Sequence, residues 1–147
     1  MKNTLIIVIS LLLGLCGCTQ YNGHIGPIFG SWSLIEISED GVALKMKEET
    51  TFSFQNQIVE VIKREDSSFS TTYRYGNFEK TDNLLILKFQ TSPTSTGNTA
   101  YMTPDWIYLP LDETSIPMDI KELNGKKMEL VLTSGPKTLQ YTFVRTW

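Results

Sequence analysis

Short apolar segments separated by turn-forming residues fill the chain from Phe29 onward. Each segment spans roughly 5 to 9 residues and is rich in β-branched and aromatic side chains, which favour strands. Apolar or aromatic residues recur at alternate positions most clearly over 69–75 and 139–143. No long segment has the period of an amphipathic helix. The pattern therefore predicts an all-β fold.

We expect eight strands, at residues 30–37, 51–55, 58–64, 69–79, 84–89, 117–121, 127–133 and 139–146. Turn signals separate them at Glu39-Asp40-Gly41, Lys80-Thr81-Asp82-Asn83 and Ser134-Gly135-Pro136. Asn124-Gly125 is predicted to form a type I′ hairpin turn, because both residues tolerate a positive φ. Residues 42–47 form either a further strand or a short helix.

These strands and their tight connections predict a single up-and-down antiparallel β-barrel of about eight strands. A closed barrel has the advantage that no strand edge is left exposed. A small β-sandwich is the alternative. The polar segment 91–99 interrupts the strand pattern, and a long connection in a compact domain is often a functional loop.

The N-terminal segment has the features of an export signal. Lys2 is positively charged, residues 5–15 are apolar, and Leu15-Cys16-Gly17-Cys18 follows. The tetrapeptide resembles a bacterial lipobox, which implies cleavage before Cys18 and acylation of that cysteine, palmitate included. The apolar run is shorter than the about 20 residues that a membrane-spanning helix needs, and it suits a secretory leader. An ordinary leader cut at another small residue is the alternative.

We therefore divide the chain into a lipoprotein signal peptide at 1–17, a flexible tether at 18–28 and a barrel domain at 29–147. Two or three acyl chains on Cys18 anchor a protein stably to a membrane. Thr19 stands where enterobacterial lipoproteins carry the aspartate that signals inner-membrane retention, and no acidic cluster follows. This resemblance indicates an outer-membrane protein that faces the periplasm.

The mature chain has few of the groups that catalysis or metal binding requires. Both cysteines, Cys16 and Cys18, lie in the leader region, and the single histidine, His24, lies in the tether. Acidic pairs such as Glu48-Glu49 are expected to be solvated, and no phosphate or calcium loop is present. We predict no enzymatic activity, no cofactor and no metal site. The net charge of −3 argues against a nucleic-acid partner.

Gly30-Ser31-Trp32 near the start of the domain and Arg145 in its last strand form a second pattern. An indole that closes the base of a barrel gains a cation–π interaction from a guanidinium over its face. Gly30 allows a tight backbone turn into the barrel. The pattern resembles the Gly-x-Trp and the final-strand arginine of lipocalins and other calycins, which implies a structural role for Gly30, Trp32 and Arg145.

Residues 29–147 are also similar to the short lipocalin-like lipoproteins of Bacteroidota. The resemblance includes the lipobox, Tyr75-Gly76-Asn77-Phe78 before 84–89, and Asn124-Gly125 before Met128-Glu129-Leu130. The middle signature and the disulfide of transport lipocalins are missing. The resemblance implies a barrel with a ligand cavity and a small hydrophobic ligand as partner.

Aromatic residues are the candidate ligand contacts. Trp106 and Tyr108 follow the polar segment 91–99 and are placed to gate the mouth of the barrel. Tyr73 and Tyr75 are expected to line the cavity, where each polar tip needs a partner. A core role is expected for four further aromatics: Phe52, Phe54, Phe69 and Tyr141.

We therefore predict a membrane-anchored lipocalin-like binding lipoprotein with a cavity for a small apolar or amphipathic ligand. The alternative is a protein-interaction lipoprotein, either an envelope-complex subunit or an inhibitor, that uses the loop 91–110. Carbohydrate binding is a variant of this alternative. An outward-facing Trp106 favours the alternative, whereas an inward-facing one favours the cavity.

Overall fold

A computed structural model describes residues 26–46, 48–65, 70–89, 109 and 115–146. It contains nine antiparallel strands. In chain order these are β1 (Gly30–Glu39), β2 (Val42–Ala43), β3 (Glu48–Gln55), β4 (Ile58–Glu65), β5 (Ser70–Lys80), β6 (Leu84–Phe89), β7 (Ile116–Leu123), β8 (Lys127–Ser134) and β9 (Lys137–Arg145).

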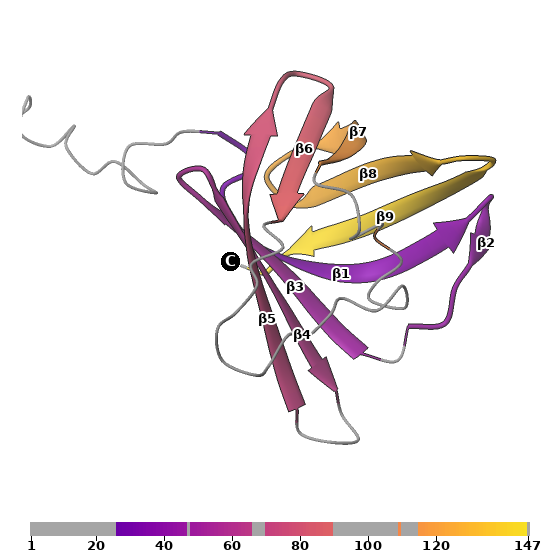
Figure 1. Ribbon diagram of the computed structural model, residues 1–147, viewed down its shortest axis with the longest axis horizontal. Helices are drawn as coiled ribbons and strands as arrows, with labels where there is room; N and C mark the ends of the chain where they lie inside the picture. Colours follow the sequence, from indigo (N-terminus) through magenta and orange to yellow (C-terminus); the bar gives the residue numbers. More distant parts are fainter. Residues whose placement is uncertain (1–25, 47, 66–69, 90–108, 110–114, 147) are drawn as a thin grey trace, which may run out of the picture.

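The strands close into a barrel (Figure 1). From β3 to β9 each strand pairs with the next one along the chain, and β9 pairs back onto β1 from Trp32↔Arg145 to Glu39↔Leu139. The short β2 pairs only with β1, so the closed wall has eight strands. The predicted up-and-down barrel is confirmed, and the sandwich alternative is wrong.

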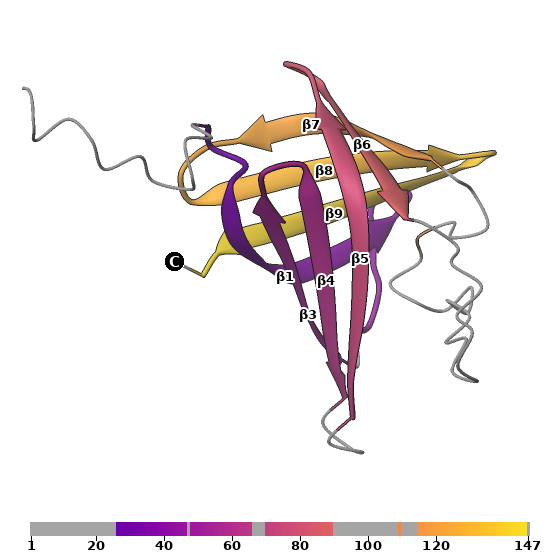
Figure 2. The same ribbon diagram turned by 60° about the vertical axis from the view of Figure 1, so that its left-hand side comes forward.

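The barrel is built from two crossing halves. In Figure 2, β3, β4 and β5 run upright, whereas β7, β8, β9 and β1 run across them. A bulge between Leu34 and Glu36 lies in β1 just where its pairing with β3 ends at Leu34↔Thr50. Because a bulge bends its strand and increases the local twist, it lets β1 leave β3 and continue along β9.

All eight predicted strands are present, with differences at their ends. The largest concerns β3, which begins at Glu48 rather than at 51, because Glu48 and Thr50 continue the inward-facing alternation of Phe52 and Phe54. Of the undecided segment 42–47, Val42–Ala43 forms the two-residue strand β2. That part of the segment is therefore a strand and not a helix.

Two hairpin turns differ in their chemistry. Asp40 and Gly41 have φ values of 49° and 83° and join the paired residues Glu39 and Val42, as a type I′ turn requires. Asn124 and Gly125 were predicted to form the same turn, but neither has a positive φ. Instead the Asn124 side-chain oxygen accepts hydrogen bonds from the backbone N–H groups of Lys126 and Lys127, both at 2.8 Å. The type I′ prediction at Asn124 is therefore wrong, because the asparagine side chain organises a longer loop.

Inward-facing apolar side chains from all eight wall strands form one core. Buried aromatic rings dominate it, with Phe52 against Phe143 and Phe54 against Phe78 at centroid distances of 5.0 Å. Both contacts are edge-to-face, the geometry that aromatic pairs prefer. The predicted core positions of Phe52, Phe54 and Tyr141 are confirmed. Phe69 lies outside the described residues.

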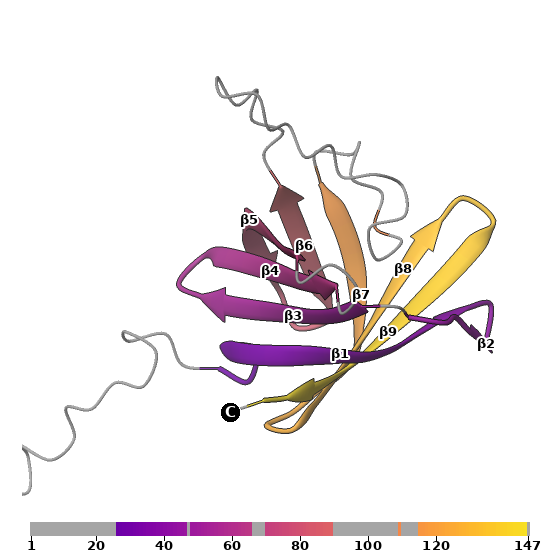
Figure 3. The same ribbon diagram turned by 90° about the horizontal axis from the view of Figure 1, so that it is seen from below.

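The up-and-down connectivity gives the barrel two distinct ends. The start of β1 and the end of β9 lie together at one end, which we call the Trp32 end (Figure 3). The turns β3–β4, β5–β6 and β7–β8 lie at this end as well. The opposite end, which we call the loop end, carries the turns β1–β2 and β8–β9 and the C-terminal ends of β4 and β6. The two ends have different interiors.

Candidate functional site

The Trp32 end is closed by the segment 27–29, which crosses the base of the barrel. The Trp32 indole N–H donates a hydrogen bond of 2.7 Å to the carbonyl oxygen of Ile28. The Arg145 guanidinium lies 4.5 Å from the centroid of the Trp32 ring, which is the contact predicted for this pair. It also donates to the carbonyl oxygens of Phe29, at 2.7 Å, and of Pro27.

Gly30 joins this closing segment to β1 with a φ of 116°. A residue with a Cβ atom adopts that conformation only with strain. Gly30, Trp32 and Arg145 thus act together on the closing segment. Trp32 is fully buried and Arg145 lies over its face, so all three residues have a structural role at this end.

The interior toward the loop end is polar on one side. The inward faces of β3, β4 and β5 carry Glu48, Thr50, Lys63, Thr72 and Arg74. The strand register places Thr50 opposite Lys63, Lys63 opposite Thr72, and the buried Val61 opposite Arg74. On these three strands, the charged and hydroxyl side chains thus lie directly beyond the aromatic core, toward the loop end.

Two of these charges form a pair. The Lys63 ammonium lies 2.6 Å from a carboxylate oxygen of Glu48, and the Lys63 side chain is only 11% exposed. A partly buried charge is tolerated when it is paired in this way. The negative charge of Glu48 therefore balances the positive charge of Lys63 inside the barrel.

Arg74 is the third charge, and its surroundings differ. Its neighbours Tyr73 and Tyr75 are exposed, so Arg74 lies on the inward face of β5 together with Gly76 and Phe78. Its Nε is buried without a hydrogen-bond partner. Burial lowers the pKa of the Arg74 guanidinium. A buried donor without an acceptor typically costs about 1–3 kcal/mol, so Arg74 is a destabilising feature of the wall.

The facing wall at the loop end is apolar. Five buried side chains of the other strands lie there, near the strand ends: Ile37, Phe89, Ile116, Leu132 and Leu139. Leu109, from the long connection between β6 and β7, is also buried against the core. The interior of the loop end is therefore amphipathic, with charge on the β3–β5 side and hydrocarbon opposite.

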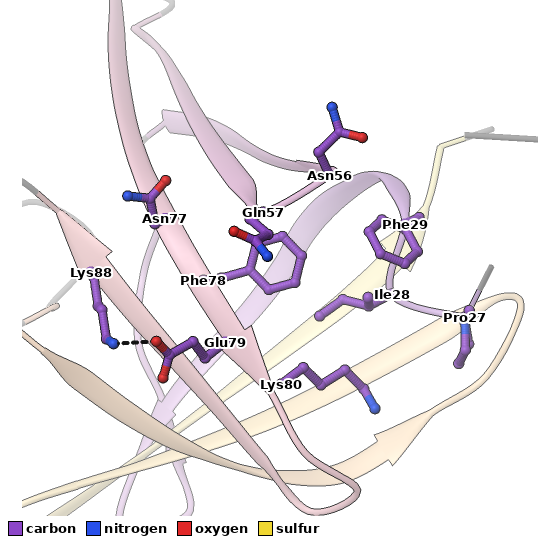
Figure 4. Close-up of a pocket in the computed structure, with 11 residues that line it drawn as sticks. Pro27, Ile28, Phe29, Asn56, Gln57, Asn77, Phe78, Glu79, Lys80 and Lys88 are labelled. Atoms are coloured by element: carbon purple, nitrogen blue, oxygen red, sulfur yellow. Dashed lines mark hydrogen bonds and ion pairs between the residues drawn. The ribbon is translucent and has the colours of Figure 1, made fainter. Parts of the chain in front are cut away.

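An open cleft of about 770 Å³ lies at the Trp32 end of the barrel (Figure 4). Ile28, Phe29 and Phe78 form its apolar part, and amide and charged side chains surround them. Each charged residue on its rim has a partner: Lys88 pairs with Glu79 at 2.5 Å, and Lys80 donates to the Thr81 carbonyl oxygen. The charged groups on the rim of this cleft are therefore already engaged within the protein.

The predicted ligand contacts Tyr73 and Tyr75 lie on the outer face of β5, with 53% and 61% of their surface exposed. The expectation that they line the cavity is wrong. The opposite phase of β5 faces inward, because Arg74 and Gly76 lie opposite the buried Val61 and Val59 of β4. A hydrogen bond with Glu60 raises the pKa of Tyr75.

The other predicted sites lie outside the described residues. These are the ligand candidates Trp106 and Tyr108, the lipidation site Cys18 and the tether residue His24. Sequence reasoning missed Arg74, although its alternation with two tyrosines on a strand was visible. Within the described ranges, no cluster of three metal-ligating side chains is present.

The chain matches the family model of the lipocalin-like domain over residues 11–145. The protein belongs to this lipocalin-like family. No curated protein matches the sequence. Among solved structures, a lipocalin-like protein from Bacteroides uniformis superposes with a TM-score of 0.61 at 18% identity, covering 83% of this chain and 100% of that chain.

An uncharacterised protein from Bacteroides eggerthii superposes with a TM-score of 0.59 at 19% identity, covering 80% of this chain and 98% of that chain. At these identities the likeness concerns the fold alone. A lipocalin-like barrel indicates a ligand-binding protein in general. No helix in the described part of the chain combines the length and hydropathy required to cross a bilayer.

Proposed function

We propose that this lipocalin-like protein is a lipid-anchored binding protein of the cell envelope, which holds a small apolar or amphipathic ligand at the loop end of its barrel without catalysing a reaction. The observation that carries the proposal is the amphipathic interior of that end. A barrel that needed only a stable core would be filled with apolar side chains, whereas this one turns Lys63 and Arg74 inward.

Binding is supported over catalysis by the family and by the groups available. Lipocalin-like proteins are typically binding proteins. The inward-facing carboxylate of Glu48 is paired with Lys63. General acid–base catalysis needs a positioned proton donor or acceptor that can reach a substrate, and a single ion-paired carboxylate is poorly suited to that task.

Native mass spectrometry of the protein extracted from its own membranes tests the binding proposal. We expect one small organic molecule to remain bound to the folded chain and to be lost on unfolding. A folded protein that carries no such molecule and takes up no neutral hydrophobic probe, such as N-phenyl-1-naphthylamine, would contradict the proposal.

The anchor is supported by Leu15-Cys16-Gly17-Cys18 in the leader. We propose that acylation of Cys18 holds the barrel at the outer membrane, on the periplasmic side. Metabolic labelling with palmitate and membrane fractionation should show a labelled, membrane-bound wild type and an unlabelled C18A variant. C16A is the matched control and should stay labelled. Labelling lost in C16A and kept in C18A would place the modification at the other cysteine.

The exposed tyrosines favour a second candidate function, protein interaction. Tyr73 and Tyr75 lie on the outer face of β5, beside the exposed Ile58 of β4. Tyrosine is enriched in protein interfaces because its ring is apolar and its hydroxyl is polar. A photo-crosslinking residue at Tyr73 should trap one dominant partner in intact cells if this surface is used. The same residue at Lys121, which is exposed on β7, should not.

A further inference from the structure

Arg74 differs from Lys63 and Glu48, the ion-paired charges that lie near it on the inner wall. Lys63 and Glu48 neutralise each other at 2.6 Å. No described carboxylate forms an ion pair with Arg74, and its buried Nε donates no hydrogen bond. Arg74 is partly buried, and a cation that is withdrawn from water is normally paired. Among the inward-facing side chains that the structure describes on β3, β4 and β5, Arg74 is therefore the cation without a carboxylate partner.

The surroundings of Arg74 limit what kind of group can supply that negative charge. Val61, directly opposite on β4, is fully buried and apolar, and Gly76 and Phe78 follow Arg74 on the same face of β5. The hydroxyl groups of Thr50 and Thr72 flank Lys63 one row further toward the loop end. An anion at Arg74 thus has hydrogen-bond donors on one side and hydrocarbon on the other.

We propose that Arg74 is the anion-binding residue of this barrel, and that it binds the carboxylate of an amphipathic ligand whose apolar body lies toward the apolar side of the loop end. The proposal deepens the binding function proposed above and rests on it. A guanidinium donates two parallel hydrogen bonds to a carboxylate. Such a ligand satisfies the Arg74 donors and balances the Arg74 charge.

Calorimetric titration of the full-length protein in phospholipid nanodiscs tests this proposal, with empty nanodiscs as the blank. The probes are decanoate and 1-decanol, which share a ten-carbon chain and differ in the headgroup charge. The wild type should bind decanoate about 10- to 100-fold more tightly than 1-decanol, the range expected for charge-assisted hydrogen bonds. R74M should lose this preference and keep its affinity for 1-decanol.

R64M is the matched control, because Arg64 is an exposed arginine on the neighbouring strand β4. It should bind both probes as the wild type does. R74K keeps the positive charge but lacks the planar guanidinium, which donates two parallel hydrogen bonds. It should retain part of the preference for decanoate over 1-decanol. R74M should also unfold at a temperature equal to or above that of the wild type, since it removes an unsatisfied buried donor.

The outcomes separate this proposal from the binding function. If neither probe binds the wild type, the binding function fails, and this proposal with it. If both probes bind the wild type equally, or R74M keeps the preference for decanoate, the role of Arg74 is overturned while the binding function stands. A strong loss of thermal stability in R74M would assign Arg74 a structural role instead.

Discussion

At the scale of single residues, a few positions stabilise this barrel strongly, and the loss of unfolding free energy on substituting them can be predicted. Gly76 and Arg145 are the clearest. Gly76 lies where β5 passes close to β6, and Arg145 ties the closing segment 27–29 to the barrel wall. Each residue contributes to stability through contacts that a different residue at the same position could not make.

G76A should destabilise the protein by about 1–3 kcal/mol, the usual cost of overpacking. The added methyl group would lie 2.7 Å from the Lys88 carbonyl oxygen and 2.8 Å from the Phe89 ring, so the strands must separate. Urea denaturation measures the change. G125A is the control: nothing lies within 4 Å of its Cβ, and its free energy of unfolding should change by less than about 0.5 kcal/mol.

R145M should lower the free energy of unfolding by about 2–4 kcal/mol, because it removes a cation–π contact and the hydrogen bonds to the carbonyl oxygens of Pro27 and Phe29. The same denaturation experiment on R64M should show almost no change, since Arg64 is exposed. Equal costs for the two variants would show that Arg145 does not secure the closing segment.

At the scale of strands and turns, the two hairpins with a glycine after Asp or Asn are held differently. The Asp40-Gly41 turn depends on positive φ values, whereas the loop after β7 depends on the Asn124 side chain. Their sequences are similar, so only the backbone geometry distinguishes them.

N124G separates the two geometries. In a type I′ turn glycine is well tolerated at this position, but here it removes the acceptor of two backbone N–H groups. We expect a loss of about 1 kcal/mol in the free energy of unfolding. The companion variant G41A should also destabilise, because Gly41 has a φ of 83°. A neutral N124G would contradict the side-chain-held loop.

Strand positions and the barrel were predictable from the sequence because alternation and turn residues act locally. The inward phase of β5 was not. Two aromatic residues on one face made Tyr73 and Tyr75 look interior, but the pairing with β4 places Arg74 and Gly76 beside the buried Val61 and Val59 instead. That constraint comes from a neighbouring strand, so it is absent from the local pattern. Arg74 became visible as a candidate only once this phase was known.

At the scale of the whole molecule, the protein has one end that is sealed and one that is amphipathic. Trp32, Arg145 and the closing segment seal the first. The second brings Lys63 and Arg74 opposite buried hydrocarbon. The described chain enters at Gly26, beside the sealed end, so the proposed anchor at Cys18 attaches to that end. The proposed ligand site lies at the opposite end.

The most direct test of the central claim is methyl and arginine NMR of the full-length protein in nanodiscs during titration with decanoate. Binding inside the barrel predicts saturable shifts of the inward-facing Ile116 and Leu132 methyl groups and of the Arg74 Nε–H. The outward-facing Ile35 and Ile58 should not move. Shifts confined to Ile58 and its outer-face neighbours, or no saturable shift at all, would contradict a ligand site inside this barrel.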